Sequence, residues 1–94
     1  MTFTESRIAG AWIIDVREVR DDRGLFATTW LPGEFTSRGL DPNLAQCNLA
    51  FNHKRGTLRG MHFQNAPHGQ AKIIRCTRGA LLDVMVDLRP GSPT

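Results

Sequence analysis

The chain has 94 residues, enough for one small domain with a limited core. Its 40% hydrophobic and 22% charged residues are ordinary for a globular protein and argue against a disordered chain. The formal net charge is +3, but the basic residues are scattered, so we expect no nucleic-acid partner, and a small anionic ligand fits the modest excess. No apolar run approaches the roughly 20 residues that span a bilayer, and residues 1–10 lack the apolar core of a signal peptide. We therefore expect a cytoplasmic protein without a membrane partner.

In chain order, the first elements predict a hairpin. Trp12–Val16 is a short apolar segment, and Asp21–Gly24 has the Asp and Gly residues of a turn. Leu25–Leu31 is rich in residues that favour strands.

The next segment, Pro32–Arg38, is the only plausible helix. Pro32 suits the first helical position, Glu34 lies near the positive end of the helix dipole, and Gly39 suits the exit.

The rest of the chain reads as strands. We predict them at Ala45–Phe51, Thr57–Gln64, Lys72–Thr77 and Ala80–Leu88, with a loop at 65–69. The last of these has the cleanest alternation of apolar and polar residues.

About six short strands and one short helix predict an all-β fold, either a sandwich or a jelly roll. A jelly roll needs about eight strands. We therefore expect residues 1–94 to be a single partial domain, either a fragment or a chain whose sheets a partner chain completes.

The two cysteines, Cys47 and Cys76, stand far apart, each in an apolar stretch. Their spacing matches no common zinc motif and provides no disulfide framework. We expect buried free thiols.

Hydrogen-bonding side chains gather on three consecutive predicted strands, which is unusual for a plain sandwich and indicates a lined pocket. These residues are Gln46, Asn48, Arg59, His62 and Lys72.

Each has a plainer interpretation. His62 stands between two apolar residues, and a histidine in that setting is more often structural than functional. Strict alternation along the strand also places Arg59 on the face opposite to His62. A bulge at Gly60 would return both to one side. Gln46 and Asn48 read equally as the solvated face of a sheet.

Lys72 shares its predicted face with Ile74 and Cys76. A charge on an apolar face is costly unless it has a partner or serves a ligand. A solvated strand position is the alternative.

A metal site is not expected. Metal-binding double-stranded β-helix proteins often use two His and a carboxylate, but Gln64 and Lys72 occupy the corresponding places. His53 and His68 fall in turn-like segments.

Several motifs in order carry a specific resemblance. They are Asp22-Arg23-Gly24-Leu25-Phe26, Gln46-x-Asn48, Gly56-Thr57-Leu58-Arg59-Gly60-Met61-His62-Phe63-Gln64, Lys72-x-x-Arg75-x-x-x-Gly79 and Asp83-Val84-x-Val86-Asp87-Leu88-Arg89-x-x-Ser92-Pro93-Thr94. Over nearly its whole length the chain resembles the N-terminal half of the dTDP-4-dehydrorhamnose 3,5-epimerases.

The resemblance implies a cupin-type jelly roll, or double-stranded β-helix, without metal or cofactor, working as a homodimer that exchanges N-terminal strands. It implies that His62 is the general base and that Lys72 stabilises the enolate. It also assigns residues to the sugar and nucleotide, some of them reaching into the partner's site. These are Arg23, Phe26, Gln46, Asn48 and Arg59.

The implied reaction is the epimerisation of a dTDP-4-keto-6-deoxyhexose at C3, C5 or both, as in deoxysugar and dTDP-rhamnose biosynthesis. A neutral imidazole suits removal of an α-proton near pH 7, an ammonium suits the developing oxyanion, and an Arg suits the diphosphate.

Two departures from the family pattern leave an alternative open. Thr28 stands where the family has an acidic residue. The resemblance also implies a Tyr as proton donor in the second half of the family, and these 94 residues contain no Tyr. The alternative is a non-catalytic fragment or remnant that binds nucleotide sugars. A metal-dependent cupin is a further alternative.

Overall fold

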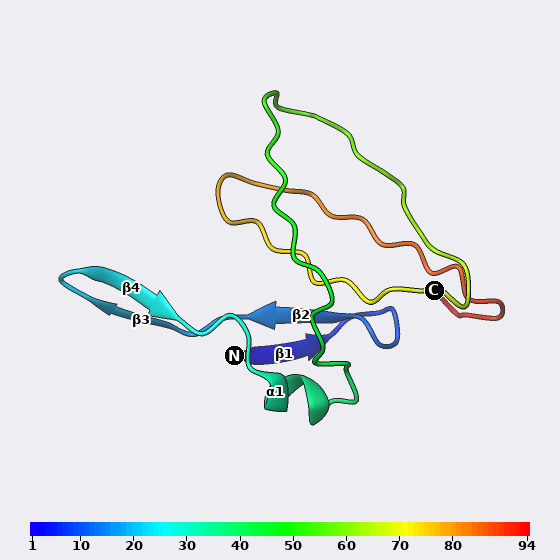
Figure 1. Cartoon of the computed structure of the whole chain (residues 1–94), viewed down its shortest axis with the longest axis horizontal. Coiled ribbons are helices and arrows are strands. Elements are labelled where there is room, and N and C mark those ends of the chain that lie inside the picture. Colours follow the sequence, from blue (N-terminus) through cyan, green and yellow to red (C-terminus); the bar gives the residue numbers. More distant parts are fainter. The chain divides into compact units, whose positions relative to one another are not determined.

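The computed structural model describes all 94 residues and contains four strands and one helix. The chain divides into two compact units. The first unit comprises Met1–Leu31 and Cys76–Thr94, and the second comprises Pro32–Arg75. All four strands belong to the first unit and the helix belongs to the second (Figure 1).

The first hairpin pairs β1 (Thr2–Glu5) with β2 (Trp12–Asp15) in antiparallel register. Phe3 lies opposite Ile14, and its ring meets that of Trp12 edge-on, with centroids 6.4 Å apart. Those three side chains share the half-buried face of the hairpin. The sequence predicted β2 but not β1, whose four residues form a strand because β2 provides a partner for their backbone.

The second hairpin pairs β3 (Glu18–Asp21) with β4 (Gly24–Ala27). This confirms the predicted turn, with Asp22 and Arg23 as its two central residues. The predicted strand Leu25–Leu31 is shorter than expected, because the last pair of the ladder joins Glu18 to Ala27.

The helix α1 (Pro32–Thr36) confirms the predicted helix and its exit. Gly39 has a φ of +70°, and its N–H donates to the carbonyl of Thr36. The N–H of Leu40 donates to the carbonyl of Phe35. This pair of bonds is the Schellman arrangement, in which a left-handed Gly satisfies the last carbonyls of a helix.

The prediction of four strands between residues 45 and 88 is wrong, because none of them forms. Residues 40–94 contain no helix or strand, although the loop at 65–69 is confirmed as a turn closed by His68 N–H donating to the carbonyl of Asn65. Alternation describes which side chains share a face, but a strand requires a neighbouring strand to pair its N–H and C=O groups. No neighbouring strand lies beside these segments, so the all-β character rests on the two hairpins.

The apolar side chains are mostly exposed. Phe35, with 3% exposure, is the only buried hydrophobic residue, whereas Leu82 in the stripe 80–88 is 87% exposed. Cys47 and Cys76 are free and exposed, so the prediction of buried thiols is wrong. The physical reason is the same as for the missing strands: without a second layer of sheet, an apolar face has nothing to pack against.

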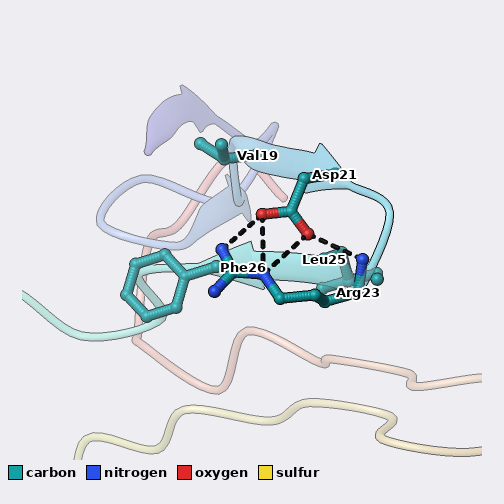
Figure 2. Close-up of a pocket in the computed structure, with 6 residues that line it drawn as sticks. Val19, Asp21, Arg23, Leu25 and Phe26 are labelled. Carbon is teal, nitrogen blue, oxygen red and sulfur yellow. Dashed lines mark hydrogen bonds and ion pairs between the residues drawn. The ribbon is translucent and has the colours of Figure 1, made fainter.

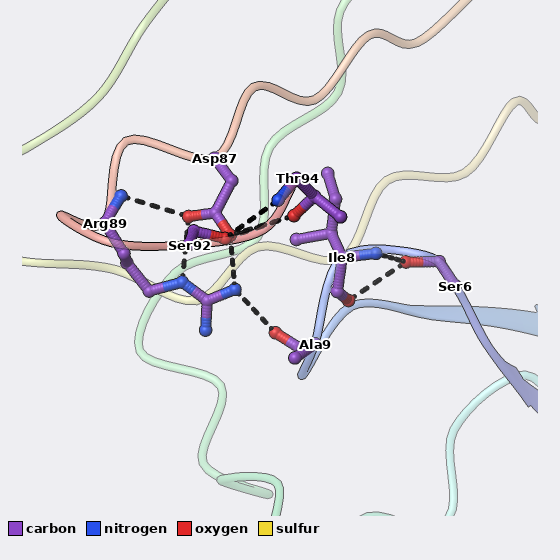
Figure 3. Close-up of polar contacts among 7 residues, drawn as sticks. All are labelled: Ser6, Ile8, Ala9, Asp87, Arg89, Ser92 and Thr94. Carbon is purple, nitrogen blue, oxygen red and sulfur yellow. Dashed lines mark hydrogen bonds and ion pairs between the residues drawn. The ribbon is translucent and has the colours of Figure 1, made fainter.

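A polar cluster joins two distant segments of the first unit (Figure 3). The Asp87 carboxylate accepts hydrogen bonds from the backbone N–H and the guanidinium of Arg89 and from the hydroxyls of Ser92 and Thr94. Arg89 also donates to the carbonyl of Ala9, 3.0 Å away, in the loop between β1 and β2. The turn 87–94 is thereby tied to the first hairpin.

No helix of the structure is long and apolar enough to cross a membrane.

Candidate functional site

The second hairpin presents an aromatic ring and a guanidinium at one open hollow of about 500 Å³ (Figure 2). Val19 and Phe26 are directly opposite each other in the ladder, as are Asp21 and Gly24. Because side chains alternate along a strand, Val19, Asp21 and Phe26 lie on one face of the hairpin. Arg23, in the turn, lines the same hollow. The structure therefore brings together two of the predicted nucleotide-binding residues, Arg23 and Phe26.

Asp21 holds Arg23 through several hydrogen bonds. Its Oδ1 accepts from the backbone N–H of Arg23 at 2.9 Å, and its Oδ2 accepts from Nε at 3.2 Å and from Nη2 at 2.5 Å. The hydrogen bonds from the Arg23 guanidinium and backbone lower the pKa of the Asp21 carboxyl, and the carboxylate raises the pKa of Arg23. Arg23 is thus a fixed cation whose side chain is 90% exposed.

A second, smaller hollow of about 280 Å³ adjoins the same two apolar side chains, Val19 and Phe26. Arg17, Thr28 and Met1 complete its lining. Thr28, the position at which the sequence departs from the family pattern, therefore lies next to Phe26.

In the second unit, Gln46 and Asn48 lie together. The amide of Gln46 donates to Oδ1 of Asn48 at 3.0 Å. This contact agrees with the shared face that their spacing predicts, although both side chains are exposed and the strand itself is absent.

Arg59 is held by the segment that precedes it. Its Nε donates to Oδ1 of Asn52 at 2.8 Å, and its Nη2 donates to the carbonyl of Phe51 at 3.4 Å. The guanidinium is exposed and keeps further donors for an anion.

His62 and Lys72 are both exposed, and the structure records no hydrogen bond or ion pair for either side chain. The alternation that would place His62 relative to Arg59 is interrupted at Gly60, whose φ of +114° favours glycine. The predicted bulge does not exist, because no ladder passes through this segment. The structure therefore joins neither His62 nor Lys72 to the other predicted residues of the second unit.

No group of three or more His, Cys, Asp or Glu side chains comes close enough to hold a metal ion.

Sequence reasoning missed two residues that hold predicted binding residues in place, Asp21 for Arg23 and Asn52 for Arg59. The role of Asp21 could have been predicted from the sequence. An Asp at the first position of a turn commonly accepts a hydrogen bond from the backbone N–H two residues later. The role of Asn52 could not have been predicted from the sequence, because its contact with Arg59 depends on how the intervening residues fold.

Comparison with known proteins gives a consistent result. Residues 5–94 match the sequence model of the family described as dTDP-4-dehydrorhamnose 3,5-epimerase. The chain is 44% identical over 94 residues to the dTDP-4-dehydrorhamnose 3,5-epimerase of Sinorhizobium fredii, covering 100% of this chain and 48% of that protein. It is 44% identical over 88 residues to that of Streptomyces griseus, covering 93% of this chain and 44% of that protein.

A further relative carries a narrower name. The chain is 46% identical over 88 residues to the dTDP-4-dehydrorhamnose 3-epimerase of Streptomyces niveus, covering 93% of this chain and 42% of that protein. The chain thus spans about half the length of the curated relatives it matches. No solved structure gives a significant match.

Proposed function

Because this chain belongs to the dTDP-4-dehydrorhamnose 3,5-epimerase family, we propose that the protein epimerises a dTDP-4-keto-6-deoxyhexose. The observation that carries the proposal is the family match over residues 5–94, which includes every predicted site residue. The reaction would remove a proton from the carbon beside the ketone and return one to the opposite face. It needs a base, a group that stabilises the enolate and an acid.

His62 is the proposed base and Lys72 the proposed electrostatic stabiliser. A neutral imidazole accepts a proton near pH 7 without further tuning. A Lys ammonium aimed at the C4 oxygen would stabilise the negative charge that develops there. Neither reaction step calls for a metal or a cofactor.

Arg23 and Phe26 are the proposed nucleotide-binding pair. Their position at one hollow of the second hairpin supports this, because a base can stack on a ring while a guanidinium meets the diphosphate. Gln46, Asn48 and Arg59, all in the second unit, are proposed to bind the sugar and the nucleotide. The pairing of the two amides and the anchoring of Arg59 support a preformed set of donors.

The proposed architecture of the whole protein is a cupin-type jelly roll that acts as a homodimer, with N-terminal strands exchanged between subunits. The exposed apolar stripe 80–88 supports it, since Leu82, Val84, Val86 and Leu88 are each more than half exposed and need a covering layer. In this proposal, residues 1–94 form part of the jelly-roll domain.

We propose that the protein inverts the sugar at least at C3. The names of the three relatives differ in whether they include C5, but each includes C3. Proton exchange at C3 is therefore the expectation shared by both kinds of relative.

The test is exchange of solvent deuterium into the sugar, followed by NMR. The protein should incorporate deuterium at C3, and His62→Asn should slow this exchange by about 10²–10⁴-fold, the usual contribution of a positioned base. His53→Asn is the matched control and should leave the rate unchanged. Undiminished exchange in His62→Asn would reject His62 as the base.

The second candidate is a non-catalytic nucleotide-sugar-binding protein, and the hollow that Arg23 and Phe26 line together is the observation that favours it. It predicts that the protein binds dTDP but exchanges no deuterium into the sugar. A protein that exchanges deuterium contradicts it.

A further inference from the structure

The second hairpin carries two acid–arginine pairs with the same spacing in sequence. Glu18 pairs with Arg20 and Asp21 pairs with Arg23, in each case two residues apart. The pairs lie differently on the hairpin. Glu18 and Arg20 share the face opposite Val19 and Phe26, whereas Asp21 lies on the same face as Phe26. Only the second pair lines the hollow.

The two pairs also differ in geometry. Arg20 contacts Glu18 through a single terminal nitrogen. Arg23 uses both Nε and Nη2 against the two carboxylate oxygens, a side-on and bidentate arrangement. The Asp21 carboxylate is itself fixed, because Oδ1 accepts the backbone N–H of Arg23 at 2.9 Å. The carboxylate therefore holds the guanidinium in one orientation relative to the turn.

The side-on pairing leaves the other edge of the guanidinium available. The remaining terminal nitrogen, Nη1, takes no part in the bonds to Asp21 (Figure 2). Nη1 and the second N–H of Nη2 together form an edge that can bind two oxygens of one anion. Phe26 lies in the same hollow as this edge.

We infer that Asp21 is a positioning residue, which orients the Arg23 guanidinium so that its free edge receives the diphosphate of a nucleotide stacked on Phe26. The inference rests on the proposed function, because it concerns the same nucleotide site. Asp21 itself does not touch the nucleotide.

Two effects of Asp21 on an anion oppose each other. Fixing the long Arg side chain before binding removes part of the entropic cost of binding. The carboxylate also repels the diphosphate, but its side chain is 49% exposed and Arg23 is 90% exposed, so water and salt screen this repulsion. The inference requires positioning to be the larger effect, so that Asp21 raises the affinity for dTDP.

The test compares affinities for dTDP and for thymidine by calorimetry. Asp21→Asn retains an oxygen for the backbone N–H of Arg23, so the turn is kept while the bidentate carboxylate is lost. We expect about a three- to tenfold weaker Kd for dTDP, the size expected from ordering one flexible side chain. The affinity for thymidine, which has no phosphate, should not change.

A double-mutant cycle and a matched control separate this role from a merely structural one. In the Arg23→Met background, Asp21→Asn should cause no further loss, because Asp21 acts through Arg23. Glu18→Gln removes the equivalent acid on the opposite face and should leave the Kd for dTDP unchanged. A full additional loss in the Arg23→Met background would overturn the inference.

A readout without ligand tests the pairing itself. In ¹⁵N NMR, the Nε–H of Arg23 should be protected from exchange with water, and Asp21→Asn should remove this protection. Unchanged or tighter binding of dTDP by Asp21→Asn would overturn the inference about Asp21 but not the proposed function. Failure of the unmutated protein to bind dTDP would overturn the proposed function as well.

Discussion

At the scale of single residues, the most consequential side chain outside the proposed site is Asp87. Its carboxylate is only 3% exposed, and hydrogen bonds from Arg89 and Ser92 hold its pKa far below the ordinary value of 3.8. A carboxylate with so many donors is stabilised only in its ionised form. It stabilises the contact between the turn 87–94 and the loop at Ala9.

This pKa predicts a dependence of stability on pH. Because the pKa of Asp87 is lower in the folded state, its contribution is fully present above 3.8 and is lost as the pH falls toward the folded-state value. Asp87→Asn should therefore lower the free energy of unfolding at pH 7, and the difference from the unmutated protein should shrink below about pH 4. Urea unfolding at several pH values measures this. A difference that stays constant down to pH 3 would contradict it.

Lys72 allows a second prediction at this scale. If its ammonium stabilises the enolate, Lys72→Met should lower kcat by about 10²–10³-fold, the usual effect of removing one group that stabilises a developing oxyanion. The KM should change little, since the charge appears only in the transition state. Lys54→Met, which removes another Lys of the second unit, is the control and should leave kcat unchanged. Equal effects of both substitutions on kcat would count against the role of Lys72.

At the scale of elements, the hairpin β3–β4 depends on one glycine at its turn. Gly24 opens β4 directly opposite Asp21 and has a φ of +132°, a conformation that residues with a Cβ rarely adopt. Neither Asp22 nor Arg23 has a positive φ, so the turn places all of its unusual backbone geometry at Gly24.

Gly24→Ala is therefore expected to destabilise the protein by about 1–3 kcal/mol. It should also weaken dTDP binding, because Arg23 and Phe26 flank this residue. Gly33→Ala is the control, since Gly33 has no positive φ and a Cβ there meets open space. That change should be neutral or stabilising by up to about 1 kcal/mol. Unfolding in urea and calorimetry with dTDP test both, and equal stability of the two variants would refute the argument.

The elements also show why prediction succeeded in some places and failed in others. The helix α1 and the turn before Gly24 are local, since Pro32, Gly39 and Asp21 act on a backbone within a few residues. The hairpin arm Glu18–Asp21 was missed because its charged composition gives no apolar alternation. The segments 45–88 were predicted from alternation alone, and alternation does not provide a pairing partner.

At the scale of the whole molecule, the predicted site residues are divided between the two units. Arg23 and Phe26 belong to the first, and the other five belong to the second. Within each unit, neighbouring residues are brought together where a turn or a short contact does so, as for Gln46 and Asn48.

The exposed apolar side chains predict the state of association. Leu58 is 90% exposed and Leu49 is 87% exposed, and exposed apolar surface on this scale is covered in stable proteins. Light scattering on the purified protein should give twice the mass of one chain, in accord with the proposed homodimer. A monomer at micromolar concentration would contradict the proposed strand exchange.

The sequence by itself determined the family, the helix with its glycine exit, the turn of the second hairpin and the residue types available for proton transfer. These depend on local backbone preferences and on residue identity along the chain. Only the tertiary structure decided that β1 pairs with β2, that Arg89 reaches the carbonyl of Ala9 and that Asn52 holds Arg59, because each of these needs two groups to meet in space. The same reason explains why the stripe 80–88, clear in sequence, is not a strand here. An apolar face becomes part of a sheet only when a neighbouring backbone and a covering layer are present.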